Sequence, residues 1–261
     1  MEYLFGKVVR MAESFLIHIP HSSTYIPLIE KEKFMLTEEE LQQELLVMTD
    51  WYIDELFNIP EHEKQINKIS RLVMDPERFR DDNDEEMSGC GMGAIYTNTS
   101  DGRQLRKILS DERERLLIQY YDPYHQQFTE KVEKILDSHG RCLIIDAHSF
   151  PSTPLPYEKS NNAIRPAICI GYNDFNNIPG LPRISYEIFF WDYAMDVRFN
   201  EPFSGSIVPS KYYKVDKRVA SIMIEINRSL YMDEKTGAKL PNFGEIKDML
   251  KKYFEYIPQF I

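Results

Sequence analysis

The chain has 261 residues, a net charge of -11 and a pI near 5.1, and this acidic balance argues against nucleic acid or an anionic membrane as the main partner. Hydrophobic residues make up 43% of the chain and the mean hydropathy is -0.44, values typical of a soluble globular protein. The length can bury a sizeable core within one domain, so we predict a single domain over residues 1–261.

Strands and helices are predicted to alternate along the chain. In chain order we predict a strand at 15–19, a helix at 37–48, a helical turn at 53–57, a strand at 65–74, a helical region at 103–139, strands at 143–146 and 167–171, a helix at 185–197, a strand at 221–226 and a helix at 242–256. Strands separated by helices favour an α/β fold with three α/β/α layers and a mainly parallel mixed sheet.

Three local signals mark the helix boundaries. Thr37 and Glu40 form a capping-box pattern at the start of the first helix. Pro123 is expected to interrupt the region 103–139, and Gly140 is expected to end it as a C-cap. Two long loops, at 80–93 and 149–162, exceed the usual length of a connection, so we predict functional roles for them.

The three cysteines, Cys90, Cys142 and Cys169, have no spacing that indicates a disulfide framework. An odd count of this kind is typical of reduced thiols in an intracellular protein. The chain has no apolar stretch of 18 residues and no signal-peptide pattern, so we expect a cytoplasmic protein with no membrane partner.

Two apolar runs each lead to a histidine next to a turn, at His21 and at His148. Ligands bind at the carboxyl ends of the strands in α/β folds, so two imidazoles at that edge suggest half of a zinc site. Asp146 lies two residues before His148 and points to the same side of a strand, where it can either orient the imidazole or act near the metal itself. His18 and His21 would lie on opposite faces of an extended segment, so we interpret His18 as a packing residue.

A zinc site with two histidines requires an acidic ligand, and Asp50 and Asp54 both follow the first predicted helix. The spacing alone does not choose between them. Glu225 lies within an apolar strand, where a carboxylate must be paired, bound to a metal or raised in pKa. A raised pKa suits a general base for hydrolysis, and a buried salt bridge with Arg228 or Arg71 is the alternative.

Two arginines, Arg71 and Arg78, flank a predicted strand end with Asp75 between them. Guanidinium groups bind carboxylates in a bidentate manner, so a substrate with a carboxylate would fit here. Asp75 could hold one of these arginines in place.

Together these segments resemble the N-formylglutamate amidohydrolase family, whose motifs recur here in the same order over about the whole chain. The matching stretches are IPHSS (19–23), TDW (49–51), SRLVMDPERF (70–79), GMGAIYTNTSDG (91–102), YDPYH (121–125), DAHSFPS (146–152), NEPFSG (200–205) and EINRSLYMDE (225–234). Ser206 and Lys211 stand where the family often shows a glycine and an arginine.

The resemblance implies a zinc-exopeptidase-like fold and hydrolysis of the N-acyl amide of an amino acid. With N-formyl-L-glutamate as substrate, the products would be formate and glutamate. The resemblance also implies a site made of a metal-binding group, a base and substrate-binding residues. One zinc ion would be bound by His21, Asp50 and His148, with Glu225 as the catalytic base, Asp146 behind the ligands, and Arg71, Arg78, His125 and Asn200 binding a small N-acyl amino acid.

Two alternatives remain open from the sequence. The protein could be a zinc hydrolase of another N-acyl amino acid or a short peptide, because the shape of the pocket sets specificity for the acyl group. It could also be a non-catalytic relative that binds an amino-acid-like ligand, which would be stabilised by that ligand without hydrolysing it.

Overall fold

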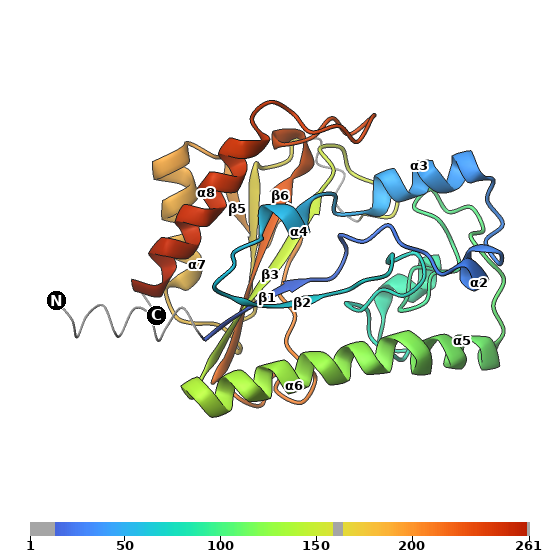
Figure 1. Cartoon of the computed structure of the whole chain (residues 1–261), viewed down its shortest axis with the longest axis horizontal. Helices are drawn as coiled ribbons and strands as arrows, with labels where there is room; N and C mark the ends of the chain where they lie inside the picture. The colour runs from blue at the N-terminus through green and yellow to red at the C-terminus, as the bar shows by residue number, and fades with distance from the viewer. Residues whose placement is uncertain (1–13, 159–163, 260–261) are drawn as a thin grey trace.

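The structure is a computed structural model and describes residues 14–158 and 164–259. Its six described strands form one sheet in the order β2-β1-β3-β6-β4-β5 (Figure 1). Neighbouring strands are parallel except β4 and β6, which are antiparallel. The strands are β1 (Phe15–Ile19), β2 (Glu63–Ile66), β3 (Cys142–Phe150), β4 (Ile168–Gly171), β5 (Val197–Phe199) and β6 (Val219–Asn227).

Helices cover both faces of this sheet, which confirms the predicted α/β fold with a mainly parallel mixed sheet (Figure 1). Apolar side chains of α4, α7 and α8 pack in one cluster with one face, and those of α6 pack against the other face. The α-helices are α2 (Leu28–Lys31), α3 (Glu38–Met48), α4 (Ile53–Leu56), α5 (Ser110–Leu116), α6 (Asp122–His139), α7 (Leu181–Glu187) and α8 (Phe243–Tyr256).

The two-residue period of the central strands divides their side chains between the two faces. On β3, Leu143, Ile145 and Ala147 belong to the cluster that contains α8, whereas Cys142 and Ile144 pack with α6. The next side chains on the α6 face, toward the carboxyl end of the strand, are polar. On β3, the α8 face is therefore apolar as far as Ala147, whereas the α6 face becomes polar at Asp146 and His148.

Helix α3 begins with the predicted capping box. Thr37 accepts a hydrogen bond from the Glu40 backbone N–H, and the Glu40 carboxylate accepts one from the Thr37 backbone N–H. The helix ends at Met48, as predicted, and the Asp50 backbone N–H then donates to the carbonyl of His21 at 3.0 Å. This bond ties the end of α3 to the segment that leaves β1.

The strand predicted at 65–74 is wrong beyond Ile66, where the chain leaves the sheet. Leu72, Val73 and Met74 are buried, and Leu72 and Met74 pack in two separate clusters that contain no strand residue. Burial on all sides gives a short irregular segment the same apolar pattern as a buried strand, so the pattern alone could not separate the two.

Two predicted helices also need correction. Pro123 does not break the region 103–139: helix begins only at Ser110, and α5 continues through a wider π-helical turn, η2 (Leu117–Tyr121), into α6, whose first turn contains the proline. The proline thus directly follows a π-helical turn, a local change in helix geometry of the kind that often accompanies a proline within a helix. Gly140 does end α6, with φ of 76°.

The helix predicted at 185–197 is displaced along the chain. It begins at Leu181 as α7 and ends with a second π-helical turn, η3 (Ile188–Asp192). Val197 instead begins β5, because residues 197–199 pair with β4. The remaining 3-10 turns are η1 (Glu86–Cys90), η4 (Arg228–Leu230) and η5 (Ile257–Gln259).

Of the two predicted functional loops, the structure describes the first in full and the second in part. The loop at 80–93 contains η1, and the one at 149–162 begins inside β3, while its residues 159–162 lie outside the described residues. The three cysteines are free, with Cys142 and Cys169 buried and Cys90 exposed. Among the described helices, none has the length and apolar character needed to cross a membrane.

Candidate functional site

A pocket of about 520 Å³ opens on the polar half of the α6 face of the sheet. Its floor includes His148 on β3 and Glu225 on β6, which are directly opposite each other in the register of these strands. His21, two residues past β1, and Asp50, two residues past α3, also line the pocket. The carboxyl ends of four elements thus bring together residues that are far apart in the sequence.

His21, Asp50 and His148 form a buried group whose ligand atoms lie within 4.8 Å of one another. Asp50 Oδ2 is 3.7 Å from His21 Nδ1 and 3.2 Å from His148 Nδ1. His21 Nδ1 is buried and has no hydrogen-bond partner, which is costly for a polar atom unless something binds it. Two imidazole nitrogens and one carboxylate oxygen are a donor set that suits a catalytic metal ion with one open position.

The second nitrogen of each histidine faces a buried carboxylate, Asp75 for His21 and Asp146 for His148. His21 Nε2 donates to Asp75 Oδ1 at 2.8 Å, and His148 Nε2 donates to Asp146 Oδ1 at 2.9 Å. In the neutral form of each ring, which is the form that binds a metal ion, these bonds place the proton on Nε2 and leave the Nδ1 lone pair facing Asp50. Asp146 is held in turn by the backbone N–H of Ile207 at 3.1 Å.

Asp50 divides its two oxygens between different partners. Oδ1 accepts from Arg228 Nη2 at 2.9 Å, which leaves Oδ2 to the histidines. Burial alone would raise the pKa of Asp50, but the neighbouring His148 and His21 and the charge of Arg228 hold it well below its usual range. Asp50 is therefore an ionised carboxylate with one oxygen free for a ligand.

Glu225 is buried on β6, and its Oε2 has no hydrogen-bond partner. Burial, reinforced by the negative charges of Asp50 and Glu77, raises the pKa of Glu225 to about 8, against the opposing effects of His148 and Arg228. The salt-bridge alternative for this residue is not seen, because Arg228 pairs with Asp50 and Arg71 with Asp75. An unpaired carboxylate with such a pKa can accept and return a proton near neutral pH.

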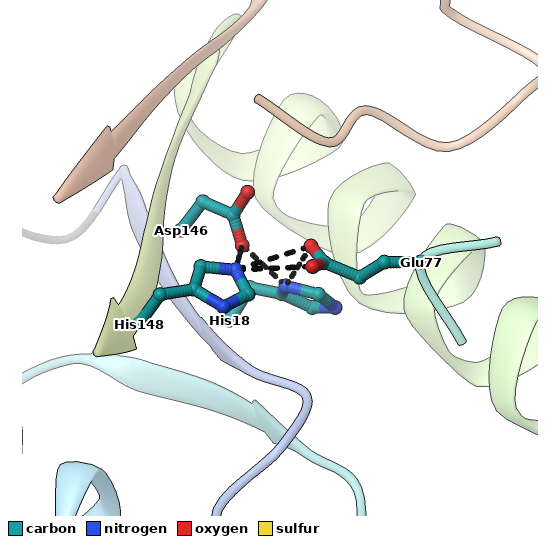
Figure 2. A group of neighbouring side chains, drawn as sticks. All are labelled: His18, Glu77, Asp146 and His148. Atoms are coloured by element: carbon teal, nitrogen blue, oxygen red, sulfur yellow. Dashed lines mark hydrogen bonds and ion pairs between the residues drawn. The ribbon is translucent and has the colours of Figure 1, made fainter. Parts of the chain in front are cut away.

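A second group could also hold a metal ion, and it shares His148 with the first. It contains His18, Glu77, Asp146 and His148, whose side chains converge in Figure 2, with Glu77 approaching from the side opposite to β3. Glu77 lies within 3.2 Å of His148 Nε2 and 3.8 Å from His18 Nδ1. The two groups would use opposite nitrogens of His148.

Hydrogen bonds within the protein already occupy most of the nitrogen and oxygen atoms of this second group. Tyr124 donates from its hydroxyl to His18 Nε2 at 2.7 Å, so the His18 proton is on Nδ1, which donates to Asp146 at 2.8 Å. His18 then has no lone pair left for a metal ion. It is buried, as expected of a packing residue, but it also takes part in this polar chain, which its position in the sequence did not indicate.

The family profile described as N-formylglutamate amidohydrolase matches residues 13–232. The chain belongs to this family. Two curated relatives are named N-formylglutamate deformylase. The protein from Pseudomonas aeruginosa is 26% identical over 230 residues, which cover 84% of this chain and 82% of that protein. The protein from Pseudomonas putida is 25% identical over 231 residues, with the same shares covered.

Solved structures support the family fold. The N-formylglutamate amidohydrolase from Ralstonia eutropha JMP134 has a TM-score of 0.82 and 23% identity, and the match covers 95% of this chain and 94% of that one. A gene product from Agrobacterium tumefaciens has a TM-score of 0.61 and 18% identity, with the same shares covered. At these identities the structures establish the fold only.

The structure places the remaining predicted residues of this family member in different ways. Arg71, Arg78 and His125 line the pocket, and Asp54 is exposed on α4, away from Asp50 and the histidines. Asn200 does not line the pocket. Its side-chain oxygen accepts from the backbone N–H groups of residues 172 and 205, so it shapes a nearby loop.

Sequence reasoning missed three contacts in this site. The sequence predicts that Asp75 could hold one of the two arginines, and it pairs with Arg71 at 2.7 Å, but the sequence does not predict its bond to His21. Arg228 was considered only as a partner of Glu225. Glu77 was not identified at all, because an acid in a loop is typically solvated and only the fold shows that this one is 18% exposed beside His148.

Proposed function

We propose that this protein is a metal-dependent amidohydrolase that cleaves the N-acyl amide of an amino acid, with N-formyl amino acids as the class to test first. The observation that carries the proposal is the convergence of His21 Nδ1, Asp50 Oδ2 and His148 Nδ1 beside the unpaired Glu225. The names of the two curated relatives, N-formylglutamate deformylase, support the formyl group as the acyl part.

A zinc ion is the cofactor that we propose for His21, Asp50 and His148. The unpaired, buried Nδ1 of His21 fits a bound cation, and the mixed nitrogen and oxygen donors fit zinc. When bound, zinc would polarise the acyl carbonyl and lower the pKa of a water molecule toward about 7.

The side chains of the pocket then have separate roles. Glu225 would accept a proton from the attacking water and deliver it to the leaving amine, so that the amide C–N bond breaks and a carboxylic acid and a free amino acid form. Arg78 would bind the carboxylate of the substrate. Asp75 and Asp146 would hold the two imidazoles in orientation.

The test combines metal content with formate release from N-formyl amino acids. We expect the wild-type protein to bind about one metal ion per chain and to release formate. His148→Ala and Asp50→Asn should lose both properties. Glu225→Gln should keep the metal but lose about 10²- to 10⁴-fold in kcat, because it removes the base and not a ligand.

Asp54→Asn provides a matched control, since Asp54 is the other acid that the sequence offered and it is exposed. This variant should keep wild-type metal content and activity. Full activity in His148→Ala or Glu225→Gln would contradict the proposal. Tight binding of an N-formyl amino acid with no hydrolysis by metal-loaded protein would favour the non-catalytic alternative.

We also propose that the chain acts as one domain. The candidate site draws on residues from His21 to Arg228, so a division within this range would separate groups that must act together.

A further inference from the structure

The charges that line the pocket limit the substrate. Five carboxylates and three guanidiniums line it, with no lysine among the described residues. A substrate carboxylate therefore depends on the arginines, and each arginine can serve only if its donors are not already used.

Two of the three arginines are committed to the protein. Arg71 donates through Nε and Nη2 to Asp75 and through Nε to the Tyr96 hydroxyl. Arg228 donates through Nε to Ser149, through Nη1 to the carbonyl of residue 47 and through Nη2 to Asp50. Both guanidiniums hold the metal-binding group and the segment beside it.

Arg78 differs from these two. Its Nε is buried without a hydrogen-bond partner, and its ion pair with Asp75 is long, at 3.8 Å. Its side chain retains 24% exposure, and it lines the pocket. Of the three arginines that line the pocket, Arg78 is thus the one without a close carboxylate partner, which leaves its charge available for one carboxylate of a ligand.

Other candidates for a second cation do not provide one. Burial, above all, lowers the pKa of His125 to about 4, and its ring bonds to the carbonyl of residue 76, so it is a neutral group at pH 7. Lys211 lies in the loop that closes the pocket but pairs with Glu133 and does not line the pocket. Glu77, next to Arg78 in the chain, adds a negative charge to the same wall.

The walls of the pocket are strongly aromatic. Phe79 and Tyr213 remain 56% and 38% exposed, so a ligand could cover them. The volume of about 520 Å³ falls in the range of drug-sized ligands, roughly 300–1,000 Å³. The aromatic residues that line the pocket are Phe79, Tyr121, Phe150, Tyr157, Phe203 and Tyr213.

We infer that the pocket selects N-acyl amino acids with one carboxylate and an apolar or aromatic side chain over N-acyl dicarboxylic amino acids such as N-formylglutamate. This inference rests on the proposed function for the reaction, and it concerns which amino acid the site accepts. Arg78 binds the single α-carboxylate, and the aromatic wall covers the side chain. A second carboxylate would be buried near Glu77 without a free cation, which opposes binding.

Three substrates separate the two parts of this inference. N-formyl-L-glutamine matches N-formyl-L-glutamate in shape without the second charge, and N-formyl-L-phenylalanine adds an aromatic side chain. We expect kcat/KM to follow the order phenylalanine, glutamine, glutamate, with each step about tenfold or more. An equal or higher value for the glutamate substrate would overturn the inference.

The same order should appear in binding alone, measured by titration calorimetry on metal-loaded Glu225→Gln. This measurement keeps the two proposals apart: absence of formate release from all three substrates would contradict the proposed function, whereas the order of affinities decides the inference. Equal affinity for the glutamine and glutamate derivatives, or no binding of any of them, would overturn it.

Arg78→Met identifies the carboxylate that Arg78 binds. If it binds the α-carboxylate, which all three ligands share, the variant should weaken all three by a similar factor. A loss confined to N-formyl-L-glutamate would mean that Arg78 binds the side-chain carboxylate, and it would overturn the inference.

Discussion

At the scale of single residues, the site depends on how each histidine divides its two nitrogens. A neutral imidazole has one donor and one acceptor nitrogen. Asp75 and Asp146 accept from Nε2 of His21 and His148, and this leaves both Nδ1 atoms as acceptors toward the pocket. The two aspartates therefore determine the orientation and tautomer of the proposed ligands without touching a substrate.

Glu225 makes the stability of the metal-free protein depend on pH. Its pKa is about 8 in the folded state, against 4.5 for an ordinary glutamate, because it is buried. Between these values the folded state holds a proton that the unfolded state has released. The stabilising contribution of Glu225 is complete below pH 4.5 and is lost as the pH rises through about 8. The free energy of unfolding should therefore fall as the pH rises.

We expect the Tm of chelator-treated wild type to fall between pH 6 and 9 more steeply than that of Glu225→Gln, by about 2–4 °C for each kcal/mol. Scanning calorimetry at a series of pH values measures this. The pKa of His148 is also raised, because Glu77 and Asp146 outweigh the effect of its burial. His148 therefore also makes stability fall with rising pH, but it is present in both proteins and does not account for a difference between them. Parallel curves for the two proteins would contradict the role of Glu225.

At the scale of elements, one irregular segment, 70–79, carries Arg71, Asp75, Glu77 and Arg78. Arg106 holds it from behind. This arginine is 1% exposed and donates to the backbone carbonyls of Leu72, Val73 and Tyr96. The segment has no neighbouring strand, and the Arg106 side chain instead donates hydrogen bonds to its backbone carbonyls at Leu72 and Val73.

Arg106→Met should therefore destabilise the protein by about 2 kcal/mol or more, because it leaves buried carbonyls unpaired. It should also raise KM, since the segment that positions Arg78 loses its support. Arg103→Met is the matched control. Arg103 pairs with Glu40 and Asp101 at the surface, where solvent screens ion pairs, so its loss should destabilise the protein far less than the loss of Arg106. Urea unfolding measures both, and equal effects would contradict this role of Arg106.

The sequence predicts the regular elements better than this segment. The strands at β1, β3, β4 and β6 and the capping box of α3 follow from local patterns that the fold retains. Leu72 and Val73 have the composition of a strand, yet their carbonyls bond to a side chain 33 or 34 residues away. No local pattern reports such a partner.

At the scale of the whole molecule, the sequence likewise predicts some residues of the candidate site and not others. His21, Asp50, His148 and Glu225 could be selected because motif order adds to their local patterns, and the fold brings them together. Glu77 could not be found, because its burial arises from the packing of its loop against distant strands. The number of free arginines also required the structure, since a sequence shows which cations exist and not which are already paired.

The register of β3 with β6 sets His148 opposite Glu225 in the two middle strands of the sheet. Amide hydrogens in such strands exchange with solvent only when the whole domain opens. We expect the amides around these two residues to be among the slowest to exchange, as mass spectrometry of deuterated protein would show. Rapid exchange there would contradict this. The spacing between His148, the proposed metal ligand, and Glu225, the proposed base, is then maintained as long as the domain stays folded. Substitutions in the loops around the pocket should therefore leave this spacing unchanged.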